Sequence, residues 1–257
     1  MFLILKLKNE RKKETIQFSQ TMSSTFITIL VTFVRHGQTD YNLKEFTQGQ
    51  SNVPLNQKGI EQAILAGKSL SQNKFDLIYS SDLSRAYKTA ETIVEKNEAV
   101  KEALQIVPEV LLRETSHGIY EHKPSSALKE AAEAAGFSEI DMRRFRPPEG
   151  ENQDDVELRA REFVYKLIRA QCGKPKSANN ILVVSHGLIL REIFKILFEK
   201  DIGDMVSLEE RKAVLLAGTG PNTGISKFKL TIEDINCDLI STKCISFYSD
   251  DHLNTSS

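Results

Sequence analysis

Apolar, strand-like runs alternate with amphipathic helical patterns along most of this 257-residue chain, and this alternation constrains the fold more than any other feature. The run "FITILVTFV" at 26–34 is rich in β-branched and aromatic residues and predicts a buried strand. In "NQKGIEQAILAGKSLS" at 56–71, small and apolar residues recur on one helical stripe. The alternation predicts an α/β fold, a three-layer α/β/α sandwich whose central sheet is mainly parallel and covered on both faces.

The same two patterns continue to the end of the chain. They predict strands at 75–81, near the end of 105–114, and at 181–185, 223–232 and 244–248, and helices at 82–97, 127–135, 152–167 and 188–200. Gly136 suits the end of a helix. The chain shows no repeats and no linker long enough to split it, so we expect one domain at 22–257.

The first 21 residues precede the strand pattern and differ in character. The segment "MFLILKLKNERKKE" places a short apolar run before its charges, the reverse of a secretory signal, and lacks a cleavage pattern of small residues. We expect residues 1–21 to be a disordered extension, with a targeting or membrane-surface role as the alternative.

Charge, cysteine content and hydropathy exclude several classes of protein. The 34 Lys and Arg residues nearly balance the 35 Asp and Glu residues, and Trp is absent, which argues against a broad nucleic-acid surface. Three scattered cysteines, Cys172, Cys237 and Cys244, suit neither a zinc site nor a disulfide framework and favour a reducing compartment. No apolar run is long enough to cross a bilayer. We expect a cytoplasmic protein, with nuclear or mitochondrial association as alternatives, and a monomer rather than an oligomer.

Side chains that can hold an anion follow several of the predicted strands. Arg35 and His36 come directly after the strand at 26–34, and His186 follows the strand at 181–185. Arg85 lies just beyond the strand at 75–81, and Glu114 ends the strand-like run at 105–114. In open α/β sheets, ligands bind beyond the carboxyl ends of the strands. We therefore expect these five side chains to meet at one rim of the sheet.

Two arginines, two histidines and a carboxylate at one rim predict a pocket for a phosphate dianion. Guanidinium groups match phosphate oxygens through paired hydrogen bonds. A neutral imidazole can attack phosphorus, and a carboxylic acid can protonate the leaving oxygen. This chemistry requires no metal or other cofactor, because fixed positive groups neutralise the charge on the phosphoryl oxygens. The expected partner is a small phosphorylated metabolite.

Each of these residues also has an ordinary structural interpretation. A single histidine after a strand is more often a satisfied structural residue, and Arg85 or Glu114 alone could be a surface charge. Their joint arrival at strand ends favours the catalytic interpretation. The remaining histidines, His117, His122 and His252, lack this context and are expected to be surface or loop residues.

The motifs "VRHGQTDYN", "SSDLSRAYKTA", "LLRE" and "VVSHG" resemble, in this order, those of the histidine phosphatase superfamily, also called the phosphoglycerate mutase-like family. The resemblance covers about 26–253 and implies a phosphoglycerate mutase-like fold. "PNTGISKF" at 221–228 and "DDHLN" at 250–254 are similar to fructose-2,6-bisphosphatases of this superfamily. The resemblance therefore implies hydrolysis of fructose 2,6-bisphosphate to fructose 6-phosphate, which lowers glycolytic flux.

The resemblance also implies roles for individual residues. His36 would become phosphohistidine, and Glu114 would protonate the departing sugar oxygen and then activate the hydrolytic water. The remaining matched positions would hold the phosphoryl group or line the pocket: Arg35, Asn42, Gln48, Gly49, Arg85, His186 and the backbone of Gly187. The alternatives are a bisphosphoglycerate phosphatase, a mutase-type phosphotransferase and a non-catalytic scaffold.

Some positions depart from the family pattern. Gln38 stands where a glutamate is usual, which removes a negative charge beside the pocket, and His122 and Glu149 stand where glycine is usual. Arg143 and Arg144 occupy a segment where mutase relatives place arginines for a second anionic group. A solvated basic patch is the other interpretation of this pair, and it is slightly favoured.

Overall fold

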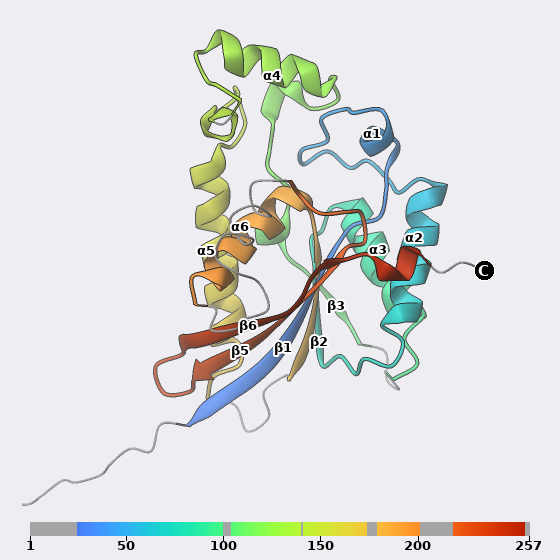
Figure 1. Cartoon of the computed structure of the whole chain (residues 1–257), viewed down its shortest axis with the longest axis vertical. Coiled ribbons are helices and arrows are strands. Elements are labelled where there is room, and N and C mark those ends of the chain that lie inside the picture. Colours follow the sequence, from blue (N-terminus) through green and yellow to red (C-terminus); the bar gives the residue numbers. More distant parts are fainter. Residues whose placement is uncertain (1–24, 100–103, 140, 174–178, 201–217, 255–257) are drawn as a thin grey trace, which may run out of the picture.

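A computed structural model describes residues 25–99, 104–139, 141–173, 179–200 and 218–254, and its centre is a six-stranded sheet (Figure 1). The strands are β1 (Phe26–Arg35), β2 (Leu77–Ser80), β3 (Ile106–Pro108), β4 (Asn180–Ser185), β5 (Ile225–Glu233) and β6 (Asp238–Ser249). Their order across the sheet is β3-β2-β4-β1-β5-β6. The first four strands in this order are parallel, whereas β5 and β6 are antiparallel additions beside β1. The predicted, mainly parallel α/β architecture is confirmed.

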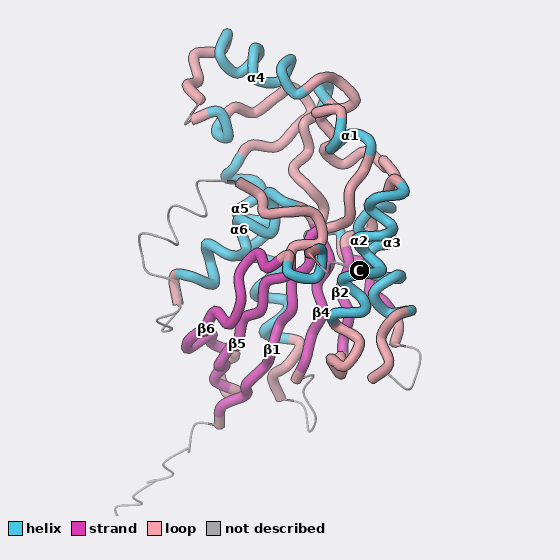
Figure 2. Tube along the Cα trace, turned by 45° about the vertical axis from the view of Figure 1, so that its right-hand side comes forward, coloured by secondary structure: helices cyan, strands magenta, loops and turns pink. Residues whose placement is uncertain are grey.

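Helices cover both faces of this sheet. The pair α2 (Gln57–Ser69) and α3 (Ser84–Glu95) packs on one face, and α5 (Gln153–Arg169) and α6 (Gly187–Phe198) pack on the other (Figures 1 and 2). The short α1 (Asp40–Leu43) and α4 (Ser125–Ala134) lie beyond one end of the sheet (Figure 1). Four 3-10 helices complete the described elements: η1 (Val110–Leu112), η2 (Gly118–Tyr120), η3 (Met142–Arg144) and η4 (Asp251–Leu253).

The alternating side chains of β1 supply two apolar clusters, one on each face of the sheet. Phe33 packs with the α5 and α6 side and meets the ring of Phe194 edge-on, with 5.3 Å between centroids. Val34 points the other way and packs with Ala66 of α2 and Ala90 of α3. Because both faces are buried, β1 is an almost continuous apolar run, and this property made it recognisable in the sequence.

Most predicted elements are present with shifted ends, but the run at 105–114 is largely not a strand. Only Ile106–Pro108 pairs with β2, and η1 follows immediately. Pro108 has no N–H to donate to a continuing ladder. Glu114 therefore lies in a loop beyond β3, and the expectation that it ends a strand is wrong.

The expectation for His252 is also wrong. Its side chain is buried in η4, and its Nε2 lies 3.0 Å from Oγ1 of Thr223. Gly136, in contrast, ends α4 as predicted, with a φ of +87° that favours glycine.

Two sequence predictions depend on the ends of the chain. Residues 1–21 lie outside the described residues, so the disordered extension and the domain boundary at 22 stay predictions. Across the part of the chain that the structure describes, the helices are all too short or too polar to cross a bilayer.

Candidate active site

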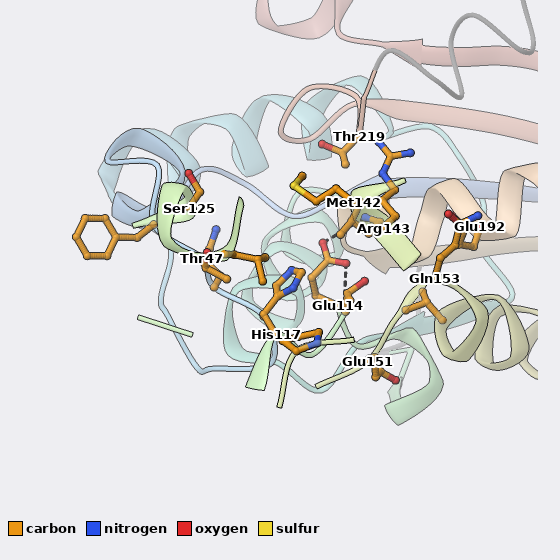
Figure 3. Close-up of a pocket in the computed structure, with 18 of the residues that line it drawn as sticks. Thr47, Glu114, His117, Ser125, Met142, Arg143, Glu151, Gln153, Glu192 and Thr219 are labelled. Carbon is orange, nitrogen blue, oxygen red and sulfur yellow. Dashed lines mark hydrogen bonds between the residues drawn. The ribbon is translucent and has the colours of Figure 1, made fainter. Parts of the chain in front are cut away.

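A cavity of about 470 Å³ lies at the carboxyl ends of the parallel strands (Figure 3). It is lined by most of the predicted site residues: Arg35, His36, Asn42, Gln48, Gly49, Arg85 and Glu114. His186 and Gly187 are neighbours of residues that line it: His186 contacts the ring of His36, and Gly187 contacts the side chain of Thr219. The chain thus brings together side chains from widely separated segments at one rim, because parallel strands end on the same side.

His36 follows β1 with its ring buried and fixed. Its N–H donates to the Ser185 carbonyl at 2.9 Å, and its Nδ1 lies 2.7 Å from the carbonyl oxygen of Gly37. Because a carbonyl oxygen only accepts, Nδ1 carries the proton and Nε2 keeps a free lone pair. Burial, followed by the charges of Arg85 and Arg35, holds the pKa of His36 well below 6.5. The ring is therefore neutral at pH 7, as a nucleophile requires.

His186 stands next to His36, with 5.1 Å between the ring centroids. Its Nε2 is 2.8 Å from Oγ of Ser81, which follows β2, while its buried Nδ1 has no partner among the described residues. Burial is the main cause that lowers the pKa of His186 well below 6.5. Gly187 begins α6. A Cβ there would lie 2.4 Å from the Thr219 side chain, so the close contact between residues 187 and 219 requires glycine.

Two guanidinium groups border the pocket and are held by main-chain carbonyls. Arg35 donates to the Gly220 oxygen at 2.6 Å, and Arg85 donates to those of Gly49 and Ser51, both at 2.8 Å. Burial lowers the pKa of Arg35 and lowers that of Arg85 to about 10, so both remain charged at neutral pH. Their Nε atoms are buried, with no hydrogen-bond partner in the described ranges. These fixed donors suit an anion.

The Glu114 carboxylate lies across the amino end of α6. Its Oε2 accepts from the Leu188 N–H at 3.2 Å, and its Oε1 accepts from the Thr115 N–H at 2.9 Å (Figure 3). The first N–H groups of a helix have no partner within it, and they favour a negative charge. This contact holds a carboxyl group at the pocket although its segment is a loop.

Arg159 of α5 clamps the loop that carries Glu114. Its guanidinium donates to the carbonyl oxygens of Leu111 at 2.9 Å, Arg113 at 3.1 Å and Glu114 at 3.4 Å. It also forms a two-pronged pair with the carboxylate of Glu151, at 2.7 and 2.8 Å. Sequence reasoning missed Arg159, because its spacing on α5 resembles that of any polar helix residue.

The segment that carries Asn42, Gln48 and Gly49 closes another side of the pocket. The Thr39 hydroxyl oxygen lies 3.1 Å from Oδ1 of Asn42 and 3.0 Å from Oε1 of Gln48. Gly49 has a φ of +54°, and a Cβ there would lie 2.0 Å from Oε1 of Glu121. The positive φ favours glycine at this turn, and the carbonyl oxygen of Gly49 accepts from Arg85.

The family model for the histidine phosphatase superfamily (branch 1) matches residues 31–217. The chain belongs to this superfamily. Mouse fructose-2,6-bisphosphatase TIGAR is 32% identical over 87% of this chain and 96% of its own. A solved mycobacterial glucosyl-3-phosphoglycerate phosphatase is 25% identical, with a TM-score of 0.68 over 87% of this chain and all of its own. The solved phosphoglycerate mutase from Bacillus anthracis has the same TM-score at 23% identity, and the match covers 88% of this chain and 95% of the mutase. The expected phosphoglycerate mutase-like fold is confirmed.

One departure from the histidine phosphatase pattern, Gln38, is held at the start of α2. The side chain of Gln38 accepts from Asn56 at 3.1 Å, and its N–H donates to Gln62 at 2.9 Å, so it packs at the start of α2. Gln38 is not among the residues that line the cavity, and the effect of the missing negative charge stays a prediction.

Two other departures retain a glycine-like backbone. His122 and Glu149 have φ values of +65° and +61°, in the left-handed region that favours glycine. The loops therefore keep the conformation that glycine allows, at some cost in strain. His122 is exposed, as predicted, and its Nδ1 lies 2.8 Å from the hydroxyl of Tyr41.

Sequence reasoning missed several residues of the histidine phosphatase pocket: His117, Met142, Glu151, Glu192 and Thr219 (Figure 3). His117 is in a loop, as predicted, but it lines the cavity instead of the open surface, and burial lowers its pKa. Arg143 also lines the cavity, whereas Arg144 is exposed, with its Nη1 3.9 Å from Asp141. The solvated-patch interpretation therefore holds for Arg144 only. No feature of the sequence marks His117, Met142, Glu151, Glu192 or Thr219 as residues of the pocket.

The described residues hold no group of three or more His, Cys, Asp or Glu side chains arranged to bind a metal ion. The guanidinium charges of Arg85 and Arg35 act on both histidines, and they repel a cation. The pocket suits an anionic ligand.

Proposed function

We propose that this chain is a phosphatase that hydrolyses a small phosphorylated sugar, fructose 2,6-bisphosphate, through a phosphohistidine at His36. The observation that carries the proposal is the state of that ring. Nδ1 is bound to the Gly37 carbonyl, burial and the charges of Arg85 and Arg35 lower the pKa of the ring, and both arginines line the same cavity. An unprotonated Nε2 among fixed cations is the arrangement that phosphoryl transfer to histidine needs.

In the first step, Nε2 of His36 attacks phosphorus and the bond from phosphorus to the sugar oxygen breaks. Glu114 gives a proton to the departing oxygen, so the sugar leaves as an alcohol. Arg35 and Arg85 neutralise the phosphoryl oxygens through donors that the protein leaves unpaired. His186, which contacts the His36 ring, offers its Nδ1 as a further group near the phosphoryl position.

In the second step, a water molecule attacks the phosphohistidine. The carboxylate of Glu114 accepts a proton from that water, the bond from phosphorus to Nε2 breaks, and inorganic phosphate leaves. Both residues then return to their starting states. The contacts of Glu114 with two backbone N–H groups keep it in reach for both proton transfers.

Two observations support a sugar bisphosphate. The relatives that match most of this chain, from mouse and frog, are named as fructose-2,6-bisphosphatases. The cavity also has a third arginine, Arg143, on its wall beside Glu192. A second phosphate could pair with Arg143 while the first occupies the position between Arg35 and Arg85. As a cytoplasmic fructose-2,6-bisphosphatase, the chain would lower glycolytic flux.

A phosphatase for phosphoglycerate-type esters is the second candidate, because one relative is named for glucosyl-3-phosphoglycerate and covers 68% of this chain. A mutase would start with the same step but must return the phosphoryl group to a second acceptor.

The deciding experiment is phosphate release from a panel of esters at equal concentration. The panel holds fructose 2,6-bisphosphate, fructose 1,6-bisphosphate, 2,3-bisphosphoglycerate, glucosyl-3-phosphoglycerate and 3-phosphoglycerate. We expect the highest kcat/KM for fructose 2,6-bisphosphate, with fructose 6-phosphate as the sugar product. A higher kcat/KM for a glycerate ester would move the assignment to the second candidate. Isomerised phosphoglycerate without phosphate release would indicate a mutase.

A further inference from the structure

The two C-terminal motifs, 221–228 and 250–254, meet where Thr223 contacts His252, and the first motif runs into β5, which pairs with β1. Thr223 is fully buried and has a φ of +58°, which a β-branched residue rarely adopts. His252, in η4, is also buried, and its Nε2 lies 3.0 Å from the Thr223 hydroxyl. A strained backbone persists only where its surroundings fix it, and the His252 ring is one of the groups that contact Thr223.

The turn that contains Thr223 holds the backbone of the two residues that begin the active site. The Thr223 N–H donates to the Arg35 carbonyl at 3.0 Å, and Nδ2 of Asn222 donates to the His36 carbonyl at 2.9 Å. The Arg35 N–H in turn donates to the Gly224 carbonyl at 3.3 Å. The position of His36 therefore depends on the conformation of this turn.

The His252 side is anchored independently of the pocket. η4 packs against α2, and its turn is fixed by the Leu253 N–H to the Asp250 carbonyl at 2.8 Å. The Ser249 hydroxyl donates to the Asp251 carboxylate at 2.9 Å. His252 thus connects a fixed segment near the end of the chain to the turn that supports His36.

We propose that His252 is a positioning residue for the His36 nucleophile and acts through the hydroxyl and backbone of Thr223. His252 touches no substrate in this account. It holds the turn at 221–224 in the geometry that aims the His36 ring at phosphorus. The inference rests on the proposed function, because it concerns the rate at which His36 takes up the phosphoryl group.

The test compares four single variants and the double variant His252→Ala with Thr223→Val, at a temperature well below their melting points. His252→Ala and Thr223→Val remove the two partners, Thr223→Ser keeps the hydroxyl, and Ser246→Ala changes another residue that lines the cavity beside His252. Single-turnover phosphorylation of His36, the KM and inhibition by orthovanadate are measured. Vanadate reports the pocket without requiring turnover, because it mimics the five-coordinate phosphorus.

We expect His252→Ala and Thr223→Val to slow phosphorylation about 10-fold and to weaken vanadate inhibition by about the same factor, with KM within about two-fold. Thr223→Ser and Ser246→Ala should match wild type. Because the two partners act as one unit, the double variant should be no slower than either single variant. If His252→Ala folds poorly, His252→Gln, which keeps a hydrogen-bonding group, should recover much of the rate.

Two results would overturn the positioning role. One is His252→Ala with a lower melting temperature but a wild-type phosphorylation rate and vanadate affinity, which is what a purely structural residue would give. The other is a double variant whose effects multiply. Absence of phosphohistidine in the wild type would instead refute the proposed function, and the vanadate comparison would still judge His252.

Discussion

At the scale of single residues, the pocket depends on neutral histidines among charged arginines. Burial and two guanidinium charges hold the pKa of His36 well below 6.5, and the same causes act on His186. Each neutral ring therefore has a lone pair at neutral pH, which can form a bond to phosphorus or accept a hydrogen bond. The arginines remain cationic in spite of burial, so the pocket combines a nucleophile with fixed positive charge.

The depressed pKa values predict a pH dependence of stability. The unfolded state takes up a proton near pH 6.5, whereas the folded histidines do not, so their contribution is fully present above pH 6.5 and is lost as the pH falls further. Each buried ring should remove up to about 1.4 kcal/mol of unfolding free energy per pH unit in that window. Chemical denaturation at pH 7, 6 and 5 should show a shallower decline for His36→Asn than for wild type. Equal slopes would mean that His36 titrates normally in the folded protein.

Glu114→Gln is expected to slow turnover by about 10²–10⁴-fold while KM changes little, because the amide cannot transfer a proton but keeps one oxygen for one of the two backbone N–H donors. Steady-state kinetics measure the effect. Glu130→Gln, on the exposed surface of α4, is the matched control and should behave as wild type. Wild-type turnover in Glu114→Gln would remove the residue from the acid role.

At the scale of elements, the ends of strands and the starts of helices place most of the site, and loops place the rest. The strand-end rule predicted the positions of His36, His186 and Arg85 from sequence, since β1, β2 and β4 are buried apolar runs that sequence patterns reveal. It placed Glu114 for the wrong reason, because β3 ends at Pro108 and α6 supplies the contact that holds the carboxylate. His117 was missed because the path of its loop depends on long-range contacts.

Arg159 of α5 holds the Glu114 loop, so we expect Arg159→Lys to lower kcat about 10-fold with little change in KM. Lysine keeps the charge but cannot bridge three carbonyl oxygens and a carboxylate. The pH profile of kcat should shift as the Glu114 loop loosens. Arg161→Lys, two residues further along α5 in an exposed pair with Glu157, is the control. A normal kcat and pH profile in Arg159→Lys would mean that α5 only supports the fold.

The loop around Glu149 offers a test of backbone strain. With a φ of +61°, this position should be more stable as glycine than as alanine by about 1 kcal/mol, because alanine keeps the Cβ clash of the left-handed region. Thermal unfolding of Glu149→Gly and Glu149→Ala measures the difference. Equal melting temperatures would show that the loop adopts another conformation in solution.

At the scale of the whole molecule, one sheet buried on both faces brings distant parts of the chain to a single rim. The pocket gathers segments that end or turn beyond the carboxyl ends of β1, β2 and β4. These segments carry residues 35–36, 85, 114 and 186. This architecture could be predicted from the alternation of patterns. The contact between η4 and the turn before β5 could not be predicted, because a contact between residues 223 and 252 leaves no periodic signal in the sequence.

Transfer of a phosphoryl group to His36 is tested most directly by rapid mixing with fructose 2,6-bisphosphate labelled at the 2-phosphate, followed by quenching under alkaline conditions and peptide mapping. The account predicts acid-labile label on the peptide that contains His36, formed at least as fast as turnover and abolished in His36→Ala. Label on another residue, or labelling that survives His36→Ala, would contradict it.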